Sequence, residues 1–309
     1  LGKRRLKDQL HAPIRCHDQL NRRLDGIDEL IAFDQKPLIA TLQQIGDCER
    51  IITRCSMGQA KPHDCLTLKR SLAMIPTIKK QLCVYKSTKI QNIQSDIDVQ
   101  EALVLELENA ILDEPSNTIR DGGVIRDGYD ITLDELRYIA NHAQETLLAF
   151  EHEQRERTGN PQLKVSFNRV HGFYIEMSRS KDHIIPDDYI RRQTLKNVER
   201  YTMPALKAFE DKVLSAKSSA LNREKELYDA LLQSISQCLD PIMAYANAVA
   251  EIDLMMSFAI VAKENHWTRP TFDSQSTIDI QEGIHPVIAA RSSHRFVPND
   301  TCLNAKTRL

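Results

Sequence analysis

The sequence predicts a mainly α-helical protein that carries one small antiparallel β-sheet. Three observations support this prediction. Apolar residues recur at helical spacing over residues 1–112, 133–157 and 204–265. A clear two-residue alternation, which is typical of strands, fills residues 163–203. Hydrophobic residues make up 41% of the chain and aromatic residues only 6%, which favours helices packed through Leu, Ile and Ala. A chain of 309 residues has room for about two domains.

The first 112 residues indicate a series of short helices. Proline recurs where a new helix can begin, because it fits the first helical turn. The polar stretch over residues 85–97 carries no predicted helix. The expected helices run to Leu10, from Pro13 to Leu30, from Lys36 to Ile45, from Asp47 to Gly58, from Pro62 to Ile75, from Pro76 to Val84 and from Asp98 to Leu112.

A glycine-rich segment, DGGVIRDGY, follows at residues 121–129. It has neither the GxGxxG form nor a GKS or GKT ending, so it is not predicted to hold a phosphate group. We expect a structural turn with a short hairpin there.

Two long helices flank the alternating stretch. The first is predicted from Leu133 to Arg157, with Thr132 as its N-cap and a stop at residues 158–161. The second opens at Pro204 and keeps a 3-4 apolar spacing to Ala230, which calls for one antiparallel partner. Because the sheet lies between them in the sequence, we expect the two helices to pair as an arm with the sheet at its far end.

The chain then returns to the first helical region. Residues 242–265 are apolar on most sides, as expected for a buried helix. We therefore predict a discontinuous helical domain with the arm inserted into it. A linker at residues 267–270 leads to a new unit that begins with a strand near Thr277.

The sheet region has its own charge. We predict strands at 163–167 and 173–177, joined by a turn at 168–172, and at 189–194 and 198–203, joined at 195–197. Residues 155–203 hold ten basic and six acidic residues, a net charge of +4 in a chain of net charge −2. A local basic excess among Asn, Gln and Thr suits the backbone of a polyanion. A solvated surface explains the same charges, and this stretch alone leaves both interpretations open.

Other classes are excluded by composition. The seven cysteines are scattered and form no CxxC pair, which predicts reduced thiols in a cytosolic protein and neither a zinc site nor a disulfide framework. No signal peptide and no run of 18 apolar residues is present, so no membrane span is predicted. The chain starts without Met and stops within a pattern, so we expect an excised piece of a longer protein.

Several strings resemble the bacterial MutS family of mismatch-recognition ATPases. They are RDGGVI at 120–125, RERTG at 155–159, LKVSFNRVHGFYIEMSRS at 163–180, YIRRQTLKNVERY at 189–201, FEDKVLSAK at 209–217 and EGIHPVI at 282–288. The resemblance implies a mainly α fold with a discontinuous core (lever) domain at 1–143 and 204–267. It also implies a clamp domain of four antiparallel strands at 144–203 and the first strands of a truncated α/β ATPase domain at 268–309.

The resemblance also implies site residues. The family's clamp contacts the DNA backbone without reading bases, and Lys or Arg can neutralise phosphate while Asn donates to it. The positions carried over as DNA contacts are Lys196, Asn197, Arg169, His171, Arg191 and Arg192. Phe296 and Val297 match the family's adenine contacts. No catalytic residue and no metal ligand is predicted in this stretch.

Two signatures of the family are missing from these residues: the GxxxxGK[ST] phosphate loop and the Phe-x-Glu mismatch wedge. We therefore expect this chain neither to hydrolyse ATP nor to distinguish a mismatch from a pair. For the parent protein the resemblance implies ATP or ADP with Mg²⁺, double-stranded DNA, a MutL-type partner protein, a homodimer and a cytoplasmic, nucleoid-associated location.

Two other functions fit parts of the sequence. One is a helical scaffold whose arm docks a protein without binding nucleic acid, since the composition up to residue 150 suits it equally well. The other is a relative in the same superfamily that lacks mismatch function. The full sheet at 163–203 disfavours branches without a clamp, and the salt dependence of binding separates DNA from protein.

Overall fold

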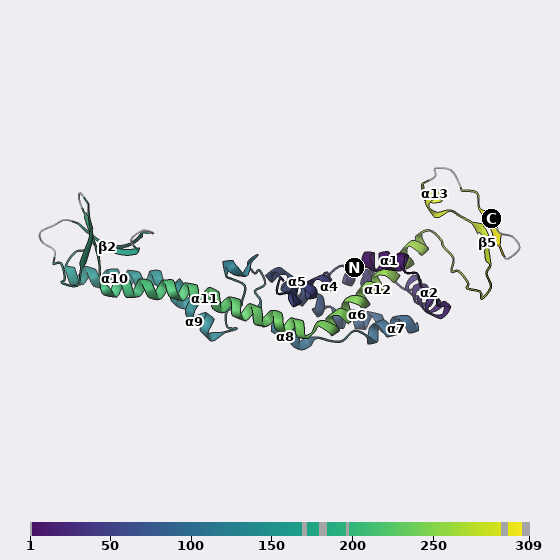
Figure 1. Ribbon diagram of the computed structural model, residues 1–309, viewed down its shortest axis with the longest axis horizontal. Coiled ribbons are helices and arrows are strands. Elements are labelled where there is room, and N and C mark those ends of the chain that lie inside the picture. Colours follow the sequence, from purple (N-terminus) through teal and green to yellow (C-terminus); the bar gives the residue numbers. More distant parts are fainter. Residues whose placement is uncertain (1, 169–171, 179–183, 196–197, 292–295, 305–309) are drawn as a thin grey trace.

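The computed structural model describes residues 2–168, 172–178, 184–195, 198–291 and 296–304. The molecule is elongated (Figure 1). A body of short helices leads on one side into a helical arm that ends in a four-stranded sheet, and a small unit with strand β5 lies at the opposite end. The predicted mainly helical fold with one antiparallel sheet is confirmed.

The body consists of short helices and one long returning helix. Prolines 37, 62 and 76 stand at the first or second helical position, as predicted, and Asp47 caps its helix by accepting a 3.2 Å bond from the Arg50 amide. The helices are α1 (Gly2–His11), α2 (His17–Ala32), α3 (Lys36–Leu42), α4 (Cys48–Ser56), α5 (Pro62–Ala73), α6 (Ile75–Leu82), α7 (Thr88–Ser95), α8 (Glu101–Ala110) and α12 (Leu239–Glu264), and a 3-10 turn lies at Ile119–Asp121.

Helix α7 lies in the polar stretch for which no helix was predicted. Ile90 and Ile93 are its buried residues, and it packs against α2, α6 and α12. Two apolar residues three apart are a weak local signal, so tertiary packing decides whether such a short segment is helical.

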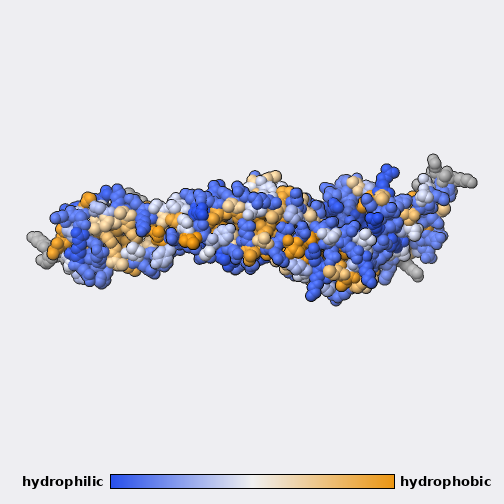
Figure 2. Space-filling model, turned by 90° about the horizontal axis from the view of Figure 1, so that it is seen from below, coloured by the Kyte–Doolittle hydropathy of each residue, from blue (hydrophilic) through white to orange (hydrophobic). Residues whose placement is uncertain are grey.

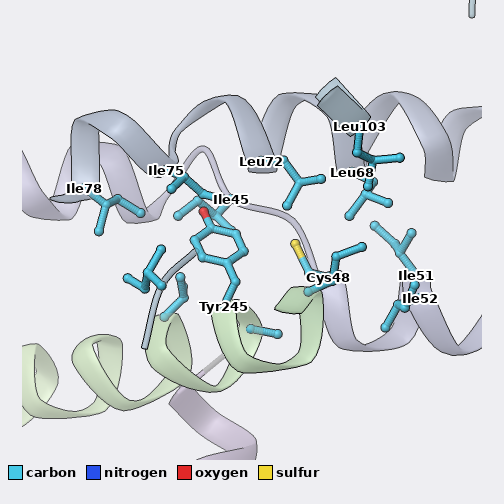
Figure 3. Close-up of a cluster of buried hydrophobic side chains, with 14 of the residues drawn as sticks. Ile45, Cys48, Ile51, Ile52, Leu68, Leu72, Ile75, Ile78, Leu103 and Tyr245 are labelled. Atoms are coloured by element: carbon cyan, nitrogen blue, oxygen red, sulfur yellow. The ribbon is translucent and has the colours of Figure 1, made fainter. Parts of the chain in front are cut away.

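Helix α12 supplies the centre of the body. Tyr245 is fully buried among side chains of α4, α5 and α6 (Figure 3), and its hydroxyl donates a 2.9 Å hydrogen bond to the Ser71 carbonyl oxygen. Burial raises the pKa of Tyr245. The core formed by the first helices therefore includes the returning helix, as predicted.

By length and composition, α12 is long and apolar enough to cross a membrane. In this structure it packs against α1, α2, α4 and α7 instead, and Glu251 in its middle is buried among cations of other helices. We interpret α12 as the core helix of the body.

The arm consists of α9 (Ile131–Asn141), α10 (Ala143–Thr158) and α11 (Pro204–Gln237). The prediction of one continuous helix before the sheet was wrong, because the helix is interrupted at His142. There the imidazole stacks on Tyr138 at 4.0 Å between ring centroids, and its Nδ1 lies 3.0 Å from the Tyr138 carbonyl oxygen. The predicted cap was also wrong. Asp130, not Thr132, accepts a 2.8 Å bond from the Leu133 amide.

Two cores lie at the two ends of the arm. One belongs to the body and reaches Ala220 on α11, and the other lies beneath the sheet and reaches Leu206. Between Leu206 and Ala216 on α11, and between Leu133 and Gln154 on the facing helices, no described residue is buried. Apolar side chains show at the surface along this shaft, among polar ones (Figure 2). We predicted that the helix before the sheet pairs with α11 along its length. In the structure α9 is the part of it that packs along α11.

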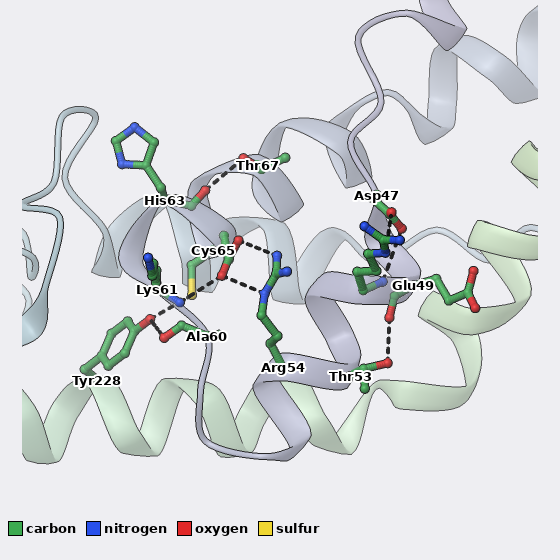
Figure 4. Close-up of polar contacts among 12 residues, drawn as sticks. Asp47, Glu49, Thr53, Arg54, Ala60, Lys61, His63, Cys65, Thr67 and Tyr228 are labelled. Carbon is green, nitrogen blue, oxygen red and sulfur yellow. Dashed lines mark hydrogen bonds and ion pairs between the residues drawn. The ribbon is translucent and has the colours of Figure 1, made fainter. Parts of the chain in front are cut away.

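The root of α11 is fastened to the turn between α4 and α5. The Tyr228 hydroxyl donates a 2.9 Å bond to the Ala60 carbonyl oxygen and lies 3.7 Å from the Cys65 sulfur (Figure 4). The Arg54 guanidinium binds both carboxylate oxygens of Asp64 at 3.0 and 2.6 Å. All seven cysteines are free thiols.

The sheet at the end of the arm has four antiparallel strands, as predicted, and the structure shows their order as β1-β2-β4-β3. They are β1 (Lys164–Asn168), β2 (Gly172–Ser178), β3 (Ile190–Thr194) and β4 (Val198–Thr202). The small unit beyond α12 holds β5 (Ile278–Gly283), α13 (Pro286–Arg291) and β6 (Asn299–Leu303), with β5 and β6 antiparallel.

Candidate nucleic-acid interface

The two faces of the sheet have different chemistry. Ile175 and Met177 of β2 are buried together with Tyr201 of β4 and Leu206 of α11. Because side chains alternate along a strand, their neighbours Glu176 and Arg200 belong to the opposite face, where they stand directly across from each other. The apolar face is thus covered by the arm, and the sheet presents a polar face on its other side.

Arg200 is held firmly on this polar face. Its guanidinium lies over the Tyr174 ring at 4.5 Å from the centroid. It also donates to Glu176 Oε2 at 3.0 Å and to Gln193 Oε1 at 3.1 Å. A cation fixed by a ring and a carboxylate organises the surface but has little free charge to offer.

Other arginines of the region are paired in the same way. Arg191 lies 3.3 Å from the Glu199 carboxylate and over the Tyr201 ring. Arg157 donates to both oxygens of Asp188, and this hydrogen bonding lowers the pKa of the Asp188 carboxyl. Arg155 forms a 2.6 Å ion pair with Glu151. Much of the positive excess is therefore neutralised within the region.

Within the described part of residues 155–203, two cations remain without a carboxylate partner: Arg192 and Lys164. Both side chains are exposed. Arg192 lies at a β-bulge, because the register between β3 and β4 shifts between Arg191 and Gln193. β3 is an edge strand whose five residues are all exposed. Bulges at sheet edges redirect side chains, so this position suits contact with a ligand.

The comparison with protein families bears on this arrangement. The model of MutS domain III matches residues 1–259, which include the body, the arm and the sheet. The chain belongs to the MutS family. MutS proteins are DNA mismatch repair proteins, so the resemblance drawn from the short strings is confirmed, and the helical body with its arm is the MutS core region.

The predicted DNA contacts of this MutS chain lie in two groups. Arg169, His171, Lys196 and Asn197 fall outside the described residues. Arg191 and Arg192 are exposed on β3, and only Arg192 has no carboxylate partner among the described part of the chain. Their contact with DNA stays a prediction.

The predicted adenine contacts lie in the small unit next to β6. Val297 is 74% exposed and Phe296 is half-buried, and the Val297 carbonyl oxygen accepts a bond from Asn299 at 3.2 Å. Their contact with adenine stays a prediction, and no GxxxxGK[ST] loop accompanies them in the sequence. Within the described ranges no group of three His, Cys, Asp or Glu residues could hold a metal ion.

Sequence reasoning missed two residues of this region. Lys164 was not among the expected contacts, although the alternation already placed it on the polar face. Glu210 of α11 accepts a 3.4 Å bond from the Phe173 amide and lies against Gly172, whose φ of +72° and lack of a side chain allow this approach. No local pattern relates Glu210 to Gly172, because they are far apart in the sequence.

Tyr189 gives the sheet a testable pH dependence. It is 8% exposed and donates to the buried Gln154 Oε1 at 3.1 Å, and burial raises its pKa from 10 to about 12. A raised folded pKa contributes stability that is fully present below pH 10 and is lost as the pH rises toward 12. Because phenylalanine cannot ionise, the free energy of unfolding of Tyr189→Phe should fall by about 2 kcal/mol less than that of the wild type as the pH rises from 10 to 12.

The measurement is a spectrophotometric titration of tyrosinate absorbance, combined with urea unfolding at the two ends of this pH range. The difference between the titrations of the wild type and Tyr189→Phe should contain one tyrosine that ionises near pH 12. A difference spectrum that instead titrates near the ordinary value would show that the hydroxyl is open to water.

Proposed function

We propose that this chain is the part of a MutS protein that grips duplex DNA through its sugar–phosphate backbone. The observation that carries the proposal is the position of the sheet. It lies at the tip of a long arm, far from the helical body (Figure 1), and its edge strand exposes Arg192 without a carboxylate partner among the described residues.

The charges support contact without base reading. Arg192 and Lys164 are exposed, and Lys196 and Asn197 lie two and three residues beyond β3 in the sequence. Lysine and arginine bind phosphate as charges, and phosphates are the same at every base pair. Such a grip suits a protein that scans DNA, because its strength does not depend on sequence.

The wider activity of the protein is proposed from family membership. We infer ATP and ADP with Mg²⁺ as ligands of the complete MutS protein, a homodimer, a MutL-type partner protein and a cytoplasmic, nucleoid-associated location. Phe296 and Val297 would contact adenine, and the arm would couple DNA contact to the nucleotide site. The segmentation into core (1–143 and 204–267), clamp (144–203) and ATPase start (268–309) is part of this proposal.

A second function is favoured by one observation. Ile184 and Ile185, which precede the edge strand in the sequence, and Ile190, its first residue, are 68%, 47% and 55% exposed. Exposed apolar side chains at an edge strand suit a protein partner. In this alternative the arm is a docking module without affinity for nucleic acid.

Salt dependence separates the two functions. We expect duplex binding, measured by fluorescence anisotropy, to weaken steeply with NaCl, with a slope of log K against log salt of about −2 to −3 if two or three phosphates are neutralised. Matched and mismatched duplexes should give the same slope and similar affinity. Absent or salt-independent duplex binding would refute the phosphate grip and favour the docking module.

A further inference from the structure

The glycine-rich loop at 121–129 surrounds a buried carboxylate of the arm. The backbone amides of Gly123, Val124 and Ile125 all donate to Glu224 of α11, at 3.2, 2.6 and 2.8 Å. The Glu224 side chain is 3% exposed. Amides that converge on one carboxylate form an anion site. The loop therefore binds an anion, and this anion is a side chain of the protein itself, so the expected structural role of the loop stands.

Arg137 of α9 completes the site. One of its terminal nitrogens, Nη2, donates to Glu224 Oε1 at 2.8 Å and to the Ile125 carbonyl oxygen at 3.0 Å, and the other, Nη1, donates to Asp127 at 2.6 Å. The buried charge of Glu224 is thus balanced by an arginine that is itself 19% exposed. The loop, α9 and α11 meet at a single carboxylate.

The glycines are required by this geometry. Gly122 and Gly123 both have a φ of +70°, a backbone conformation that other residues rarely adopt. A Cβ atom on Gly122 would lie 2.9 Å from Leu221 Cδ2 and 3.3 Å from Glu224 Oε2. Gly122 is therefore explained by close approach to α11, and Gly123 by its backbone conformation.

The neighbouring residue of α11 fixes a second point. Arg223 donates to both oxygens of Asp130, at 3.2 and 2.8 Å, and Asp130 is the N-cap of α9. Two consecutive residues of α11 are thus held by two different segments. Such a pair of contacts opposes both sliding and rotation of α11 against α9.

We call the contacts of Glu224 and Arg223 with the loop and α9 the joint. The joint lies where the arm leaves the body. Beyond Ala216 the next buried residue of α11 is Leu206, under the sheet. The shaft between them has no buried described residue that could set the direction of the arm. The direction must be set at the root.

We propose that Glu224, held by the amides of residues 123–125 and by Arg137, is the positioning residue that sets the angle and rotation at which the arm leaves the body. The experiment below measures the position of the arm, so its result does not depend on the proposed DNA contact.

The test compares Glu224→Gln with the control Asp229→Asn, which makes the same change from carboxylate to amide at an exposed position of the same helix. Lys80 in the body and Lys207 near the sheet are each replaced by a keto amino acid that carries a spin label, so that the seven cysteines stay unlabelled. Pulsed electron paramagnetic resonance then measures the distribution of distances between the two labels. Amide hydrogen exchange reports the loop. Gly122→Ala is a second variant that acts on the loop and leaves the carboxylate in place.

We expect Glu224→Gln to raise amide exchange at residues 123–125 about tenfold to about 100-fold, as for loss of bonds to a charged acceptor, and to broaden the distance distribution between the labels. Gly122→Ala should broaden it too, and Asp229→Asn should not. Released loop amides with an unchanged distance distribution would overturn the proposal. Faster exchange throughout the body, including α5 and α6, would also overturn it, since Glu224 would then serve general stability.

Discussion

Replacing Glu251 by methionine is expected to destabilise the helical body by about 3 kcal/mol, the usual cost of leaving a buried charge without its partner. The Glu251 carboxylate is 5% exposed and lies 3.1 Å from Arg5, 2.9 Å from Arg23 and 3.1 Å from Lys89. It thereby joins α12 to α1, α2 and α7. Most of the cost comes from Arg23, which is only 12% exposed and could not turn fully into water.

The same cluster gives a pH dependence at the acid side. Burial alone would raise the pKa of Glu251, but Lys89, Arg5 and Arg23 outweigh it, and the pKa is lowered from 4.5. A depressed folded pKa contributes stability that is present above the unfolded value and is lost as the pH falls through the folded value. The wild type should therefore lose its advantage over Glu251→Met below pH 4.5.

Urea unfolding of both proteins across this pH range is the measurement. The double variant Arg23→Met with Glu251→Met should recover much of the lost stability, because an apolar pair can replace a buried ion pair. Glu264→Gln, an exposed position on the same helix, should change stability by less than about 0.5 kcal/mol. Equal stability of the wild type and Glu251→Met at neutral pH would show that water, not the cations, satisfies the carboxylate.

Reversing the charge of Arg192 and Lys196 together is expected to weaken duplex binding about 100-fold or more, since each charged contact is worth about 1.5–3 kcal/mol. Arg192 is exposed on an edge strand at a β-bulge, and Lys196 lies two residues beyond that strand. The loss should be the same for matched and mismatched duplexes, because phosphates carry no sequence information.

Lys212→Glu is the matched control. It reverses one charge on the shaft of the arm, as each of the two substitutions at the tip does. Lys212 is exposed there, and its reversal should weaken binding only slightly through the general field. Anisotropy titrations at constant salt measure all three proteins. A loss confined to the mismatched duplex, or an equal loss in Lys212→Glu, would contradict a backbone grip at the tip.

Predictions from local patterns were accurate where one face of an element is apolar. The alternation of Phe173, Ile175 and Met177 located β2, and the 3-4 spacing after Pro204 located α11, because burial of one face imposes a period on the sequence. The hydrophobic period is lost where few side chains of an element are buried. The interruption at His142 has no periodic signal, because a ring and a carbonyl oxygen four residues away determine it.

Only part of the candidate site could be predicted from the sequence. The basic excess was visible, but the pairing of Arg200 with Glu176 and of Arg191 with Glu199 depends on strand register. A one-residue shift of register would exchange the two faces and give other pairs. Which cations stay exposed is thus a property of the folded sheet.

By itself the sequence determined most of the elements, their order and the family, because helix and strand periods and short strings are local information. The tertiary structure alone decided that Glu224 enters the glycine loop about a hundred residues earlier, and that Glu251 joins four helices. A buried charge takes whichever donors the packing brings within hydrogen-bond distance, and residues distant in the chain leave no periodic trace of that meeting.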